Sequence, residues 1–86
     1  PLHMKILVSL SCTMCPELVT AAQRIAVEND RITAEVYDLN HFPDLKERYE
    51  VMSVPCLILN DRDVTFGKKN VRQLLERIRE MENIPG

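Results

Sequence analysis

Two cysteines, Cys12 and Cys15, lie at the junction between an apolar run and an amphipathic stretch. The apolar run, residues 5–10, is typical of a strand buried on both faces. The amphipathic stretch, residues 17–28, repeats its apolar positions at helical spacing, and Pro16 suits the first helical turn because its missing N–H costs nothing there. This junction predicts a strand that passes directly into a helix, with both thiols at the turn.

The spacing of the two thiols indicates redox chemistry. Residues at i and i+3 on a helical turn have Cβ atoms about 5–6 Å apart, and a disulfide needs a Cα separation of roughly 4.4–6.8 Å. Unpaired N–H groups and the positive end of the dipole at a helix start favour a thiolate. We expect Cys12, at the exposed edge of the turn, to attack a substrate disulfide, and Cys15, one turn further in, to resolve the mixed disulfide.

Length and charge exclude several classes of protein. The chain has 86 residues, enough for one small domain. A net charge of -2 gives no electrostatic reason to expect nucleic acid or an anionic membrane as partner, and no apolar run is long enough for a membrane span or a signal peptide. Three cysteines, an odd number, argue against a secreted disulfide scaffold. We therefore expect a cytoplasmic protein, with residues 1–3 as a cloning remnant and residues 4–86 as the single domain.

The middle of the chain continues the alternation of strand and helix. Residues 32–39 alternate between apolar and polar and predict a second strand, so that strand, helix and strand form a parallel βαβ unit. A second helix follows, with Phe42, Leu45 and Tyr49 on one face. We expect Tyr37 and Phe42 to enter the core.

The last third predicts a hairpin and a helix. Val54 and Pro55 open an apolar run, and proline suits the first residue of a strand. A polar turn and a returning strand that ends at Phe66 follow it. Asn70 and Gln73 have the spacing of a capping box at the start of a clearly amphipathic helix. The order β-α-β-α-β-β-α predicts an α/β fold: a four-stranded mixed sheet flanked by helices, with the CxxC at the carboxyl end of the first strand.

This order, with a CxxC-Pro after the first strand and a Val-Pro opening the third, resembles the thioredoxin superfamily in its minimal, glutaredoxin-like form. Four stretches are similar to the CxxC-bearing half of the N-terminal domain of bacterial alkyl hydroperoxide reductase flavoproteins: Ser9-Leu10-Ser11-Cys12, Cys15-Pro16-Glu17-Leu18-Val19, Val51-Met52-Ser53-Val54-Pro55 and Phe66-Gly67. The resemblance covers residues 4 to about 82. It implies a minimal thioredoxin fold in which a cis Val54–Pro55 bond lies beside the CxxC.

The resemblance implies an enzyme, a protein disulfide oxidoreductase that works by dithiol–disulfide exchange. Its redox-active disulfide would join Cys12 and Cys15, with no further cofactor and no metal. Ile6 stands where thioredoxins carry a buried acid, and Gly67-Lys68-Lys69-Asn70 lacks the acid of the glutaredoxin clamp for glutathione. We therefore expect a monomer that takes electrons from a flavoprotein disulfide reductase of the thioredoxin-reductase type. It would pass them to a protein disulfide, such as that of a peroxiredoxin.

Four residues are expected to contact the substrate. Thr13 and Met14, between the cysteines, would tune the pair, and an exposed Met14 would offer an adaptable apolar contact. Pro55 is expected to pack against the disulfide. The backbone N–H and C=O of Val54 are expected to pair with a bound substrate strand, as in β-augmentation.

A metal- or iron–sulfur-binding module of the same fold is the alternative. It would use Cys12, Cys15 and Cys56; because structural zinc usually has four ligands, only Cys56, His3 and His41 could complete a set. For Cys56, alternation along the strand turns the side chain away from the surface that the preceding proline presents. Free cysteine is also often buried, so core packing is the competing interpretation of Cys56.

Overall fold

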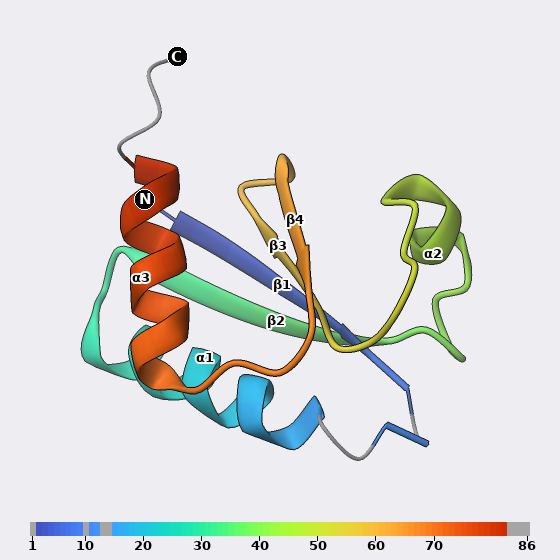
Figure 1. Ribbon diagram of the computed structural model, residues 1–86, viewed down its shortest axis with the longest axis horizontal. Coiled ribbons are helices and arrows are strands. Elements are labelled where there is room, and N and C mark those ends of the chain that lie inside the picture. Colours follow the sequence, from blue (N-terminus) through green and yellow to red (C-terminus); the bar gives the residue numbers. More distant parts are fainter. Residues whose placement is uncertain (1, 10, 13–14, 83–86) are drawn as a thin grey trace.

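A computed structural model of the chain describes residues 2–9, 11–12 and 15–82. Along the chain the elements are β1 (Leu2–Val8), α1 (Cys15–Glu28), β2 (Ile32–Asp38), α2 (Asp44–Arg48), β3 (Cys56–Leu59), β4 (Asp63–Phe66) and α3 (Val71–Glu82). This is the β-α-β-α-β-β-α order that the sequence predicts (Figure 1). No helix in the described ranges is both long enough and apolar enough to cross a membrane.

The four strands form one mixed sheet in the order β2-β1-β3-β4. β1 pairs in parallel with β2 along its whole length. On its other side β1 pairs antiparallel with β3, and β3 pairs antiparallel with β4. The CxxC loop therefore leaves the sheet from an inner strand, and the chain that enters β3 arrives beside it.

The larger of two cores lies between the sheet and the helices α1 and α3, which lie together on one face (Figure 1). Alternate strand side chains point to this face because successive residues of a strand face opposite ways. Its buried members are Leu2, Met4, Ile6, Leu57 and Leu59 from the strands, Leu18, Ala21, Ala22 and Ile25 from α1, and Leu74 and Ile78 from α3.

The start of α3 is fixed by the predicted capping box. The Asn70 side-chain oxygen accepts the Gln73 backbone N–H at 2.9 Å, and the Gln73 side-chain oxygen accepts the Asn70 backbone N–H at 3.0 Å. Two N–H groups that a helix start leaves unpaired are thereby satisfied.

The smaller core lies on the opposite face, under α2. Its buried residues are Leu7, Val51, Cys56 and Ile58, with six half-buried side chains around them: Tyr37, Leu39, Leu45, Tyr49, Val54 and Val64. None of the five residues of α2 is itself buried. This face is therefore covered as much by the chain on either side of α2 as by the helix.

A polar cluster ties this face together. The Lys5 ammonium of β1 donates to the Tyr49 hydroxyl at 3.0 Å and to the Asp61 carboxylate at 2.8 Å, and the Tyr49 hydroxyl donates to the same carboxylate at 2.7 Å. These hydrogen bonds raise the pKa of Lys5 and lower that of Asp61. The cluster joins β1, the end of α2 and the turn between β3 and β4.

Two expectations about the fold are wrong. Leu2 and His3 do not lie outside the fold, because the parallel pairing with β2 extends to them and Leu2 is buried. Phe42 is 48% exposed, because it precedes α2 instead of lying on the inner side of that helix. Its ring packs edge-on against half-buried Tyr37, with ring centroids 5.3 Å apart.

Candidate active site

A disulfide joins Cys12 and Cys15 at the start of α1, and their Cα atoms are 5.6 Å apart. Cys12 is half-buried in the loop after β1, and its backbone N–H donates to the Ser9 carbonyl oxygen at 3.1 Å. Cys15 is the first residue of α1 and is only 4% exposed. An outside group can therefore reach the Cys12 sulfur more readily than the Cys15 sulfur.

The second segment of the site is the chain that enters β3. The Val54–Pro55 peptide bond is cis, and Pro55 is buried. Because Leu7 of β1 pairs with Cys56 of β3, the register brings Pro55 beside the end of β1, where the loop to Cys12 begins.

The backbone of this segment is only partly used. The Pro55 carbonyl accepts the Gly67 backbone N–H at 3.0 Å. By contrast, the backbone N–H and C=O of half-buried Val54 form no hydrogen bond with any part of the chain that the structure describes. Val54 can therefore pair with an added chain without breaking an existing bond.

Two hollows flank the disulfide. One, of about 390 Å³, is lined by Val8, Ser9, Cys12, Cys15, Pro16, Val19 and Thr20. The other, of about 330 Å³, lies on the side of the cis proline, between the end of β2, α2 and Val54. Ser9 lines both, so the two hollows meet at the end of β1.

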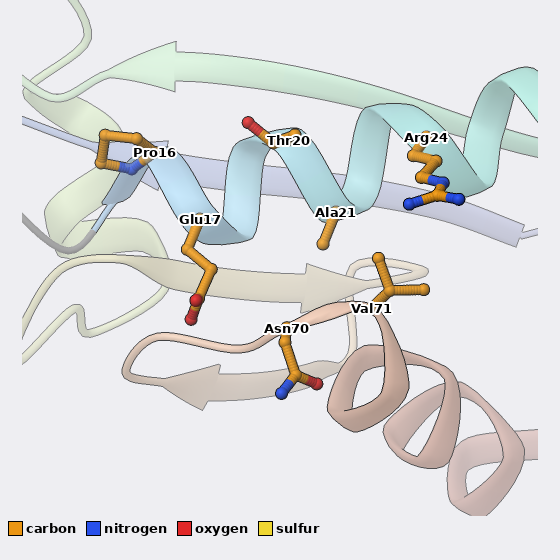
Figure 2. Close-up of a pocket in the computed structure, with 7 residues that line it drawn as sticks. All are labelled: Pro16, Glu17, Thr20, Ala21, Arg24, Asn70 and Val71. Atoms are coloured by element: carbon orange, nitrogen blue, oxygen red, sulfur yellow. The ribbon is translucent and has the colours of Figure 1, made fainter.

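A third groove lies between α1 and the start of α3 (Figure 2). Pro16 and Thr20 line it as well as the disulfide hollow, so this groove continues from the site along α1. Glu17 and Ala21 point from α1 toward the start of α3, where Asn70 lies (Figure 2). The Glu17 carboxylate opposes the positive potential of the α1 N-terminus, which is the potential that would stabilise a thiolate at the CxxC.

The third cysteine belongs to the smaller core. Cys56 is fully buried, and this burial raises the pKa of its thiol to about 11, although the nearby Lys69 ammonium acts in the other direction. Among the described residues, no three His, Cys, Asp or Glu side chains are grouped in a way that could hold a metal ion. The structure thus does not gather Cys12, Cys15 and Cys56 into one ligand set.

The other predicted site residues have mixed outcomes. Thr13 and Met14 lie outside the described residues, so their roles remain predictions. His3 is part of β1, where its Nδ1 lies 2.6 Å from the Thr33 hydroxyl, and His41 is exposed before α2. Sequence reasoning did not assign Ser9 to the site, although Ser9 opens the Ser9-Leu10-Ser11-Cys12 stretch that carries the family resemblance.

Comparison with known proteins gives a consistent result. A family model described as a thioredoxin domain matches residues 2–80. An alkyl hydroperoxide reductase of Pseudomonas aeruginosa is 37% identical over 70 residues, which are 81% of this chain and 13% of the relative. A NADH dehydrogenase of Ferdinandcohnia aciditolerans is 33% identical over 76 residues, 88% of this chain and 15% of the relative. The chain thus spans about one seventh of the length of these curated relatives.

Solved structures agree with the sequence matches. The NTD_N/C domain of the alkyl hydroperoxide reductase AhpF of Enterococcus faecalis is 38% identical, with a TM-score of 0.85 over 88% of this chain and 37% of that one. A chloroplastic thioredoxin z has a TM-score of 0.80 over 94% of this chain and 78% of that one, at 19% identity, and shares the fold. These similarities confirm both the predicted fold and the family resemblance.

Proposed function

The chain belongs to the thioredoxin-domain family, and from that membership we propose that it is a thiol–disulfide oxidoreductase. Its working group is the Cys12–Cys15 pair, which cycles between a disulfide and two thiols. The observation that carries the proposal is the Cys12–Cys15 disulfide at the start of α1, with one half-buried and one buried cysteine. No further cofactor is needed, because two thiols carry the two electrons.

The reducing half-reaction follows from the unequal exposure of the sulfurs. The Cys12 thiolate attacks one sulfur of a substrate disulfide, forms a mixed disulfide and releases the first substrate thiolate. The Cys15 thiolate then attacks the Cys12 sulfur, which restores the Cys12–Cys15 disulfide and releases the second substrate thiolate. The substrate gains two electrons and the CxxC pair loses them. The attacking thiols lose their protons to water before each step, and the two substrate thiolates take up protons from water after release. The N–H groups at the start of α1 favour the thiolate form.

We assign substrate binding to the segment that enters β3 and to the CxxC loop. Val54 would add hydrogen bonds to an extended substrate chain, a form of β-augmentation, and its unpaired backbone groups support this role. Pro55 would shape the surface next to the disulfide. Thr13 and Met14 would contact the substrate from the other side of Cys12.

The electron donor we propose is a flavoprotein disulfide reductase, and the acceptor a protein disulfide such as that of a peroxiredoxin. The relatives named as alkyl hydroperoxide reductases support this pairing. Glutathione is the less suitable donor, because Gly67-Lys68-Lys69-Asn70 lacks the acid of the glutaredoxin clamp for glutathione. The free thiol at Cys56 suits a cytoplasmic setting, where thiols stay reduced, and we expect the protein to act as a monomer.

The test is dithiol-driven reduction of insulin, followed by coupling to NADH or NADPH through a thioredoxin-reductase-type flavoprotein. Cys12→Ser should abolish turnover, because it removes the accessible attacking thiol and the remaining Cys15 is only 4% exposed. Cys15→Ser should still attack but should accumulate the mixed disulfide, which mass spectrometry detects. Cys56→Ala is the matched control, because it removes the one cysteine outside the pair, and it should retain turnover. Insulin reduction that is equal in the wild type and both CxxC variants would refute the proposal.

A further inference from the structure

The hollow on the cis-proline side of the disulfide has a distinctive lining. Its floor is apolar, formed by half-buried Leu39, buried Val51 and half-buried Val54. Met52 stands on its rim with 86% of its surface exposed. A methionine exposed to this extent offers a flexible apolar contact to a partner chain.

The charge on this hollow has one sign. Lys46, in α2, is the charged residue among the described residues that line it. Lys46 forms no ion pair or side-chain hydrogen bond within the described part of the chain, so no described residue competes with a ligand for its ammonium. The neighbouring acids Glu47 and Glu50 do not line the hollow. An anionic group that entered would therefore meet a cation and no opposing carboxylate in the lining.

The hollow adjoins the hollow that contains the redox pair. Ser9 lines both this hollow and the one that contains Cys12 and Cys15, and Val54 lines the floor. A chain held at Cys12 that pairs with the Val54 backbone would extend over Met52 and Lys46. The part of the substrate that meets this hollow would therefore be the segment next to the attacked cysteine.

From this arrangement we propose that the Lys46–Met52 hollow selects substrates. It takes an acidic segment of the partner protein that lies next to the disulfide to be reduced. The carboxylate pairs with Lys46, while the aliphatic part of the segment lies on the Leu39–Val51–Val54 floor. This proposal rests on the proposed redox function and adds the charge of the preferred substrate. Lys46 is a specificity residue here and takes no part in the exchange of sulfur bonds.

The experiment uses short peptides, each closed by one intramolecular disulfide. Aspartate, asparagine or lysine is placed in turn at each of the positions flanking one cysteine. Fully reduced protein is mixed with each peptide, and the second-order rate constant of the single turnover is measured at low and high salt. The wild type should reduce the best-placed aspartate peptide about 1.5–5-fold faster than its asparagine partner, the range of an exposed ion pair. High salt should remove most of that preference.

Three variants separate the hollow from the rest of the molecule. Lys46→Ala should lose the aspartate preference, and Lys46→Glu should reverse it in favour of lysine peptides. Arg79→Ala is the matched control, because it removes one exposed positive charge from α3, outside the hollow, and it should keep the preference. Equal rates for the aspartate and asparagine peptides at every position, or an equal loss of preference in Arg79→Ala, would overturn the proposal.

A small uncharged substrate distinguishes this failure from failure of the redox function. Hydroxyethyl disulfide carries no charge and therefore offers no carboxylate to Lys46. Its reduction should depend on Cys12 and should be the same in the wild type and in both Lys46 variants. If Cys12→Ser reduces it as fast as the wild type, the redox function itself is wrong. If its reduction depends on Cys12 while the peptides show no charge preference, only the selectivity proposal is wrong.

Discussion

Cys12, Cys15 and Cys56 carry the same functional group, and burial separates their chemistry. Cys12 is half-buried in a loop, and Cys15 is almost fully covered at the start of α1. Cys56 is fully buried on the opposite face of the sheet from α1. Only the first of these sulfurs is placed to meet another molecule.

The reactivity of Cys56 is the first consequence at this scale. In the fully reduced, folded protein, iodoacetamide near pH 8 should modify Cys12 rapidly and leave Cys56 unmodified, because the thiolate is the reactive form and burial raises the pKa of Cys56 to about 11. Mass mapping of the modified protein measures this. In denaturant all three thiols should react. Modification of Cys56 in the folded protein at the rate of free cysteine would contradict the prediction.

The same pKa gives a dependence of stability on pH. The folded thiol keeps its proton until about pH 11, whereas the unfolded thiol ionises near its ordinary value of 9.0. The unfolded state is therefore the first to lose this proton, and the free energy of unfolding should fall as the pH rises from about 9 to 11. Cys56→Ala should remove this component of the slope, as urea unfolding at several pH values would measure.

At the scale of elements, the groove between α1 and α3 and the Lys46–Met52 hollow are supported by different parts of the fold. α1 and α3 pack on each other and on the sheet, so their starts are supported by the larger core. α2 has no buried residue of its own, and its end is held through Tyr49 by Lys5 and Asp61. The groove between α1 and α3 is therefore built on firmer elements than the Lys46–Met52 hollow.

The capping box of α3 supplies the prediction at this scale. Asn70→Ala should lower the free energy of unfolding by about 1 kcal/mol, because one N–H at the helix start loses its acceptor. Urea unfolding measures the change. Gln23→Ala is the control, since Gln23 is exposed on α1 and its substitution removes no cap. If Asn70→Ala shifts the unfolding midpoint no more than the control does, the cap has no role in stability.

At the scale of the whole molecule, the sheet carries two cores of unequal size. The larger core joins β1 and β3 to two helices, and the smaller one joins them to α2 and its flanking chain. In a chain of 86 residues, the net stability of such a fold is a small difference between large terms. The loss of one buried side chain of the larger core can therefore remove a large fraction of the free energy of unfolding.

Leu57 can be used to test how much one side chain of the larger core contributes to stability. Its side chain is fully buried in the larger core, so Leu57→Ala should lower the free energy of unfolding by about 2–5 kcal/mol, through lost transfer energy and a residual cavity. Val27→Ala, at a position 83% exposed, should change it by less than about 0.5 kcal/mol. Chemical denaturation of both variants provides the comparison. A cost below about 1 kcal/mol for Leu57→Ala would mean that the core refills the space.

Local patterns in the sequence predict the order of the elements well. Periodicity identifies each strand and helix, and the Asn70–Gln73 spacing identifies the start of α3, because these signals depend on neighbours in the chain. Leu2 and Phe42 were misjudged for the opposite reason. The burial of Leu2 depends on the length of the β1–β2 pairing, and the exposure of Phe42 depends on how little of the sheet α2 covers. Neither property can be predicted from neighbouring residues in the sequence.

For the site, the sequence indicates the pair Cys12 and Cys15 directly, because a CxxC at a strand–helix junction is a local pattern. Ser9 and Lys46 were missed, since they acquire their positions only when the end of β1, the end of β2 and α2 come together. Hollows made of distant segments have no periodicity. They therefore become visible only in three dimensions.

The pairing of Leu7 with Cys56 has a consequence for how the fold can vary. One segment of the site leaves β1 and the other enters β3 at neighbouring positions of the same ladder, so the hydrogen bonds between these strands set their separation. The chain between them, which holds α1, β2 and α2, makes a long excursion and returns to the same place. Insertions or deletions in the loops of that excursion would leave the separation unchanged. Related proteins can therefore vary the lengths of these loops, and with them the surface offered to a partner. The positions of the two cysteines and of the Val54–Pro55 segment relative to each other would stay the same.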